Sequence, residues 1–327
     1  MMIYKSPQMH DIVGRCSRIA QRDKDVSFLL LGETGVGKNV LARHIHEQTP
    51  SRCNYPFVEP ALSREDNLLD SELFGYVKGA FTGAMASGHD GAFTLAKGGT
   101  VFMDEIGNLS YQGQFKLLKT IDEGWFSPVG SCQHIDIDTR IIAATNKPEA
   151  DLQAGTFFRN DLYWRINGET VVVPPLRERI EDIVPLAEHF LNRWNFSYQT
   201  SYVLDNGDKS LLMQYSYPGN VRELQGIVLH TARLSEEMVF NTEVLEETLS
   251  QRQVLIVPKA VFERSPVAQI DSLVLEKVCR QAEQACIKKV LIITKSNQTE
   301  AAKILGISRA TLRTKIRKYE LERPPDK

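Results

Sequence analysis

The segment Gly32–Asn39, with the sequence GETGVGKN, constrains the fold more than any other stretch of the chain. It follows an apolar run at Val26–Leu31 and leads into a helical pattern that begins at about Lys38. Its first seven positions match the phosphate-loop pattern GxxxxGK[ST]. In that pattern backbone N–H groups converge on phosphate oxygens, and the lysine neutralises the β- and γ-phosphates. A strand, a glycine-rich loop and a helix in this order predict a nucleotide site on a parallel α/β sheet.

The expected phosphate-binding residues are Gly32, Glu33, Thr34, Gly35, Val36, Gly37, Lys38 and Asn39. The last of them departs from the pattern, because most such loops place a Ser or Thr hydroxyl on Mg²⁺ at that position. The amide oxygen of Asn39 would coordinate the cation only weakly or through water. The strength of metal binding is therefore left open.

Two further apolar runs end in polar residues. Thr100–Met103 is followed by Asp104 and Glu105, and Thr139–Thr145 is followed by Asn146. The carboxyl ends of parallel strands share one edge of a sheet, so these side chains are expected beside the phosphate loop. We assign Asp104 as the Mg²⁺ partner and Glu105 as the base that polarises the attacking water. The amide of Asn146 would sense the γ-phosphate or hold that water.

The C-terminal end of the chain has a different charge from the rest. The net charge is −2, yet residues 271–327 carry 13 Lys/Arg against 7 Asp/Glu, a net of +6 that leaves −8 elsewhere. Residues 297–321 have the spacing of a helix-turn-helix, with Gly306 at the turn. A basic helix of this kind predicts binding to double-stranded DNA. The candidate DNA-binding residues are Ser308, Arg309, Thr311, Arg313, Lys315 and Arg317.

Composition excludes several classes of protein. The five cysteines are odd in number and form no CxxC pair, which argues against a disulfide framework or a zinc site. Reduced thiols fit a cytoplasmic protein. No apolar run reaches the roughly 18–20 residues that a membrane helix needs, and the first residues, MMIYKSPQMHDIV, lack the apolar core of a signal peptide.

Ordered motifs give the most specific information. DSELFGYVKGAFTGA at Asp70–Ala84 is followed by GGTVFMDEIG, FFRNDLYWRIN, VPPLRERIEDI and YPGNVRELQ. In this order they resemble the AAA+ ATPase domains of bacterial enhancer-binding proteins, which activate the sigma-54 form of RNA polymerase. The basic C-terminal segment resembles the Fis-type DNA-binding domain of those proteins, and residues 272–292 resemble its dimer-forming helices.

This resemblance implies a fold and a mechanism. The fold is α/β, a parallel AAA+ phosphate-loop sheet with helices on both faces and a helical subdomain, joined to a small all-α helix-turn-helix domain. ATP and Mg²⁺ are the implied cofactors. Arg159 and Arg165 resemble arginines presented to a neighbouring subunit's nucleotide, and Arg222 resembles a sensor arginine of the helical subdomain. The working form of the family is a hexameric ring, which assembles from dimers.

The same resemblance assigns the sigma-54 contact to Gly79, Ala80, Phe81, Thr82, Gly83 and Ala84. None of these side chains can act as an acid, a base or a good metal ligand. Glycines leave the loop backbone free, and an exposed Phe81 suits contact with a partner. We expect nucleotide contacts to raise this loop and hydrolysis to lower it.

Two departures from the family bear on regulation. Relatives usually place Glu at the position of Asn39, and they carry an Asn near Pro60 that restrains the catalytic Glu. We therefore expect altered coupling between partner contact and hydrolysis. The chain is also expected to lack an N-terminal receiver domain, an organisation similar to Hrp-type regulators, so that control would come from expression level or a regulatory protein partner. Two alternatives stay open: a DNA-binding regulator with impaired ATP turnover, and another AAA+ remodelling ATPase.

The expected domain boundaries follow from these patterns. They are an ATPase core at 1–175, a helical lid at 176–249, a linker at 250–270, a helix-turn-helix domain at 271–321 and a tail at 322–327.

Overall fold

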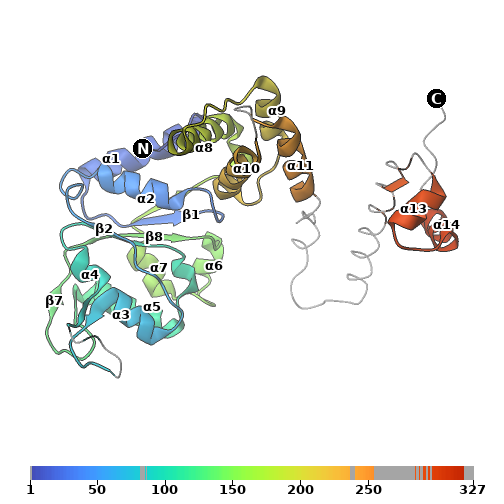
Figure 1. Cartoon of the computed structure of the whole chain (residues 1–327). Coiled ribbons are helices and arrows are strands. Elements are labelled where there is room, and N and C mark those ends of the chain that lie inside the picture. The colour runs from blue at the N-terminus through green and yellow to red at the C-terminus, as the bar shows by residue number, and fades with distance from the viewer. Residues whose placement is uncertain are drawn as a thin grey trace. The chain divides into compact units, whose positions relative to one another are not determined.

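The chain divides into two compact units in a computed structural model, residues 1–251 and 252–327 (Figure 1). The structure describes residues 2–81, 85, 87–235, 240–253, 284, 287, 290, 291, 294 and 297–319. Each unit is treated by itself below. Most of the expected linker, the expected tail and most of the expected dimer helices at 272–292 lie outside the described residues.

A five-stranded sheet forms the centre of the first unit, with the order β2-β5-β8-β1-β9 and every pairing parallel. Its strands are β1 (Phe28–Leu31), β2 (Phe57–Val58), β5 (Thr100–Met103), β8 (Arg140–Thr145) and β9 (Glu169–Val172). Every residue of β1, β5 and β8 is buried, as expected for strands covered on both faces. The predicted parallel α/β sheet is confirmed. The two edge strands were not predicted; β2 has only two residues, and β9 overlaps the short valine run at Val171–Val173 that precedes two prolines.

Helices cover both faces of this sheet. Alternate side chains of a strand point to opposite faces. Phe28 and Leu30 of β1 therefore pack with α1 (Pro7–Arg22) and α2 (Lys38–Glu47), whereas Leu29 and Leu31 face a second core. The second core is built with α3 (Asp66–Phe74), α4 (Ala92–Leu95), α5 (Tyr111–Glu123), α6 (Glu149–Gln153), α7 (Asn160–Ile166) and the 3-10 turn η1 (Ile106–Asn108). Figure 1 shows α1 and α2 on one side of the sheet and α3, α4 and α5 on the other.

Two short antiparallel ribbons extend this second face. One pairs β3 (Gly75–Tyr76) with β4 (His89–Asp90), and the other pairs β6 (Trp125–Phe126) with β7 (Ile135–Asp136). A bridge between Tyr76 and Val129 joins the two ribbons, with hydrogen bonds from Val77 N to Val129 O and from Val129 N to Gly75 O.

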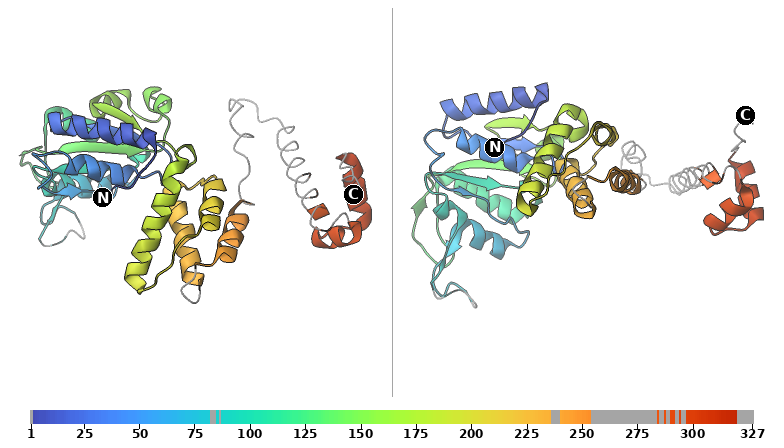
Figure 2. Two further views of the ribbon diagram at one scale, coloured as in Figure 1. Left: turned by 90° about the horizontal axis from the view of Figure 1, so that it is seen from above. Right: turned by 45° about the horizontal axis from the view of Figure 1, so that its top comes forward.

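A helical lid completes the first unit and lies beside one end of the α/β core, in yellow to orange in Figure 2. It contains η2 (Leu176–Glu178), η3 (Ile180–Asp182), α8 (Ile183–Tyr198), α9 (Asn206–Gln214), α10 (Asn220–Leu234) and α11 (Thr242–Gln253). The buried carboxylate of Asp182 ties it to the start of the chain, because it accepts hydrogen bonds from Ser6 N at 2.7 Å and Ser6 Oγ at 3.0 Å.

The described part of the second unit contains the helix pair α13 (Gln298–Ile304) and α14 (Arg309–Lys318). Ala301, Leu312 and Tyr319 are buried between them and belong to one small core. Across the described parts of both units, the helices are too short or too polar for any of them to span a membrane.

Candidate nucleotide site and DNA-binding helix

The phosphate loop connects the end of β1 to the start of α2. Gly32, Gly35 and Gly37 have φ angles of 151°, 81° and 106°, conformations that side chains rarely adopt. Gly37 lies at the N-terminus of α2, where the first backbone N–H groups have no partner within the helix. The glycines therefore allow the loop that the sequence predicts, with unpaired N–H groups at the start of a helix.

Lys38 is buried at the centre of this loop, with 6% of its surface exposed. Its Nζ donates to Gly32 O at 2.9 Å and to Glu33 O at 3.3 Å, and lies 3.8 Å from a carboxylate oxygen of Glu105. Burial lowers the pKa of the Lys38 ammonium; the charges of Glu105 and Asp104 oppose that shift, and the charge of Arg222 adds to it. A buried cation between a carboxylate and a glycine-rich loop at a helix N-terminus fits an anionic ligand.

The acidic pair lies at the carboxyl end of β5, next to β8 and one strand from β1. Glu105 has a φ of 53°, one of four non-glycine residues with positive φ in the part of the chain that the structure describes. Its carboxylate accepts a hydrogen bond from Asn146 N at 3.3 Å, and the Asn146 amide donates to Thr34 Oγ1 at 3.3 Å. Backbone strain at a candidate base is typical of functional sites. The structure thus brings Asp104, Glu105 and Asn146 to the loop edge, as predicted.

Asn39 faces an acidic neighbour that the sequence analysis missed. Its amide donates to Glu59 Oε2 at 2.6 Å, and its oxygen accepts from Arg43 Nε at 3.3 Å. Glu59 directly follows β2, a two-residue strand that apolar patterning does not detect. Both ends of the Asn39 amide are therefore engaged by protein. Among the described residues, no group of three or more acidic, His or Cys side chains could hold a metal ion, so Asp104 as a Mg²⁺ partner stays a prediction.

The lid approaches the loop closely through the start of α10. Val221 N donates to Gly35 O at 3.0 Å, and a Cβ at Gly35 would lie 2.5 Å from Gly219 O and 3.1 Å from the Cβ of Arg222. The charge of Arg222 also reaches Lys38, whose pKa it lowers. The predicted sensor arginine is thus held near the phosphate loop of its own chain.

Arg159 and Arg165 lie away from that loop. Arg159 pairs with Asp161 at 2.5 Å and stands over the rings of Tyr111 and Phe115, at 5.0 and 5.2 Å. Arg165 pairs with Asp122 at 2.9 Å. Among the described residues, neither guanidinium contacts the phosphate loop. A role for these two arginines in a neighbouring subunit's site therefore stays a prediction.

The GAFTGA segment begins after β3. Phe81 is 47% exposed, and its ring packs edge-to-face with the Tyr76 ring, with the ring centroids 5.0 Å apart. Gly79 has a φ of 74° with open space where a Cβ would be. Ala80 lies between these two residues, whereas Thr82, Gly83 and Ala84 lie outside the described residues. An exposed aromatic side chain two residues from an unobstructed glycine agrees with a contact surface.

The helix pair in the second unit has the local geometry that its sequence predicts. Ser308 caps α14 by accepting from Thr311 N at 3.0 Å, and Gly306 occupies the turn with a φ of 64°. Arg309, Arg313 and Arg317 are exposed, as is Thr311, and Lys315 is half-buried. Because Leu312 faces the core, the cationic side chains lie on the remaining surface of α14.

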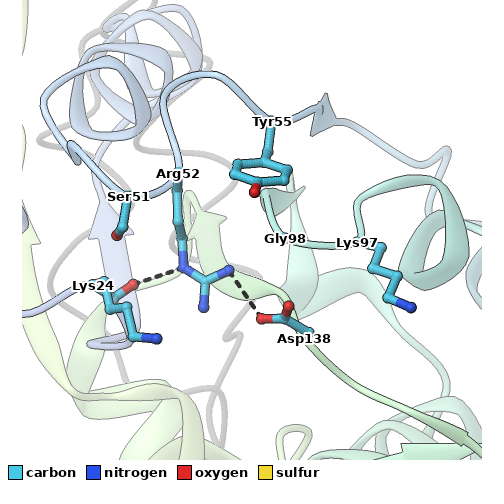
Figure 3. A pocket seen from close by; sticks show the side chains of 7 residues that line it. All are labelled: Lys24, Ser51, Arg52, Tyr55, Lys97, Gly98 and Asp138. Atoms are coloured by element: carbon cyan, nitrogen blue, oxygen red, sulfur yellow. Dashed lines mark hydrogen bonds and ion pairs between the residues drawn. The ribbon is translucent and has the colours of Figure 1, made fainter.

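A further pocket lies at the opposite edge of the sheet and is separate from this site. It has a volume of about 510 Å³ and is lined by Lys24, Ser51, Arg52, Tyr55, Lys97, Gly98 and Asp138 (Figure 3). Arg52 is committed to protein groups, since it donates to Lys24 O at 3.0 Å and pairs with Asp25 at 2.6 Å. Arg52 therefore links its own loop to the loop at Lys24 and Asp25, which precedes β1.

Known families match nearly the whole chain. The family described as the sigma-54 interaction domain matches residues 2–172. The chain belongs to this family. An AAA+ ATPase lid domain matches residues 177–256, and the Fis family of bacterial regulatory proteins matches residues 279–319.

Two relatives are named as transcriptional regulators. The hydrogenase transcriptional regulatory protein HoxA of Cupriavidus necator is 40% identical over 310 residues, which cover 94% of this chain and 62% of HoxA. The DNA-binding transcriptional regulator NtrC of Azospirillum brasilense is 36% identical over 341 residues, 98% of this chain and 70% of NtrC. The chain thus spans less than two thirds of HoxA.

Solved structures agree on the fold. NtrX from Brucella abortus superposes with a TM-score of 0.69 at 24% identity, over 97% of this chain and 69% of NtrX. The family and the fold inferred from the ordered motifs are therefore confirmed.

Proposed function

We propose that this chain is an ATP-hydrolysing activator of the sigma-54 form of RNA polymerase, which binds DNA upstream of promoters and remodels the closed complex to the open complex. The observation that carries the proposal is the Lys38 ammonium, 3.8 Å from the Glu105 carboxylate at the edge of the phosphate loop. This edge supplies what phosphoryl transfer requires of a protein, namely a cradle for phosphates, a cation and a positioned carboxylate. NtrX has been crystallised with ATP, which supports nucleotide binding by this fold.

In this proposal the loop N–H groups and Lys38 bind the phosphates, and Asp104 would hold Mg²⁺. The magnesium ion would neutralise charge on the β- and γ-phosphates. Glu105 accepts the proton of the attacking water, and Asn146, which bonds to Glu105 and Thr34, orients that carboxylate. The Arg159 surface, with Tyr111 65% exposed and Phe115 50% exposed, fits contact with a neighbouring copy in a ring.

Phosphate release measured over a series of protein concentrations tests this function. Specific activity that rises cooperatively with concentration is expected, because each site would borrow arginines from the next subunit. A sigma-54 transcription assay with an upstream DNA fragment tests the coupled output. Absence of phosphate release at every concentration would refute the ATPase.

The second candidate is a DNA-binding regulator with impaired ATP turnover. The engaged Asn39 amide favours it, since Glu59 and Arg43 occupy both ends of the side chain that stands where a Mg²⁺ ligand is usual. Nucleotide binding without phosphate release, together with specific DNA binding, would select this candidate.

A further inference from the structure

The side chain of Glu33 connects the phosphate loop to the lid. Its carboxylate accepts hydrogen bonds from both terminal nitrogens of Arg177 at 2.9 and 2.7 Å, and from the Asn220 amide at 3.0 Å. Arg177 belongs to η2 and Asn220 begins α10, so two lid elements meet at one loop residue. The negative charge that Glu33 would otherwise bring to a phosphate site is neutralised by this guanidinium.

Asn220 is buried and fully hydrogen-bonded. It is 0% exposed, and its amide nitrogen donates to Thr34 O at 3.1 Å as well as to Glu33. Its oxygen accepts from Leu176 N at 2.8 Å. Its backbone has a φ of 54°, a conformation that Asn tolerates better than most residues. Among side chains of this size only an amide offers two donors and an acceptor, so Asp cannot reproduce the pattern.

The backbone next to Asn220 reinforces the same contact. Val221 N donates to Gly35 O at 3.0 Å, and Arg222 follows in the first turn of α10. A displacement of Asn220 would therefore displace Arg222, whose charge reaches Lys38.

We infer that Glu33, Arg177 and Asn220 form a clasp that positions Arg222 at the phosphate loop and transmits nucleotide binding to the lid. This inference rests on the proposed function of the site and deepens it. Glu33 and Asn220 are positioning residues, because their side chains contact each other and the lid and act through Arg222 and the loop backbone.

Four variants of the full chain test the clasp. Asn220→Asp removes both donors and places a carboxylate against Glu33. Glu33→Gln alone removes the charge. The double variant E33Q/N220D restores one donor–acceptor pair, from Gln at position 33 to Asp at position 220. Asn206→Asp is the matched control, since it adds the same charge at an exposed position of the lid.

Two measurements distinguish the effect of the clasp on the lid from nucleotide binding at the phosphate loop. Titration with a fluorescent ATP analogue (mant-ATP with MgCl₂) gives the dissociation constant. Hydrogen exchange of the nucleotide-free protein reports the protection of the α10 amides, which needs no nucleotide. We expect N220D to weaken mant-ATP binding by about tenfold or more and to speed exchange in the first turns of α10. We expect E33Q/N220D to bind more tightly than N220D, and N206D to match the wild type.

Unchanged affinity and unchanged α10 exchange in N220D would overturn the inference. So would a double variant no better than N220D, because E33Q removes one of the two facing carboxylates of N220D and should relieve their repulsion if the two side chains meet. If the wild type failed to bind mant-ATP, the proposed function would fail, and the exchange data would still decide whether the clasp holds the lid.

Discussion

The substitution Gly35→Ala tests how closely the lid approaches the phosphate loop, because the added methyl group would meet lid atoms. The new Cβ would lie 2.5 Å from Gly219 O and 3.1 Å from the Cβ of Arg222, at a φ of 81°. Gly37 in the same loop is a matched control, since its φ is 106° and a Cβ there would meet nothing within 4 Å. Both variants carry backbone strain, but only Gly35→Ala also carries a steric clash.

The magnitudes follow from these two geometries. A left-handed conformation costs an alanine about 1–2 kcal/mol, and overpacking adds about 1–3 kcal/mol. We expect Gly37→Ala to lose about 1–2 kcal/mol and Gly35→Ala about 2–5 kcal/mol. The difference of about 1–3 kcal/mol corresponds to roughly 2–12 °C in Tm for a domain of this size.

Thermal unfolding of the nucleotide-free full chain, followed by circular dichroism, measures this difference. Gly35→Ala should unfold at the lower temperature and should also bind nucleotide more weakly, because the clash pushes Arg222 away from the loop. Equal melting temperatures for the two variants would refute the close approach of Gly219 to the loop.

Four further predictions concern the rest of the chain. Phe81→Ala should keep ATPase activity but abolish open-complex formation in a sigma-54 transcription assay; loss of both would make Phe81 a packing residue. Glu105→Gln should still bind mant-ATP while kcat falls at least about a hundredfold, because the general base is removed; an unchanged kcat would exclude Glu105 as the base. Arg313→Ala should weaken DNA binding and reduce its salt dependence in a fluorescence anisotropy titration; an unchanged salt slope would remove Arg313 from the interface. Burial raises the pKa of the Cys16 thiol to about 11, so iodoacetamide at pH 8 should modify the exposed Cys132 and spare Cys16, as read by peptide mass spectrometry; equal labelling would contradict the buried site.

The direction of the pKa shift of Cys16 determines how its labelling depends on pH. A thiol with a raised pKa stays protonated at pH 8, and the thiolate is the reactive form. Labelling of Cys16 should therefore increase only as the pH approaches 11 or when the protein unfolds. The comparison within one chain removes differences in reagent and exposure time.

The amino-acid sequence by itself determined the central strands, the phosphate loop and the helix-turn-helix. These features depend on local chemistry: buried strands read as apolar runs, a phosphate loop needs glycines at positive φ, and a DNA-binding helix needs its cap and its turn. The order of the motifs also determined the family, because five matching motifs in one order identify it without any structure.

Only the tertiary structure decided which side chains meet across the chain. The partners of Asn39 and Glu33 come from distant segments, namely Glu59 after a two-residue strand and Asn220 at the start of a lid helix. Glu59 lies in none of the five motifs, and the YPGNVRELQ motif that contains Asn220 does not show that its amide reaches the phosphate loop. The position of Arg222 at its own loop follows from α10 packing on Gly35. Such contacts depend on how the lid packs against the sheet, and no local sequence pattern encodes that packing.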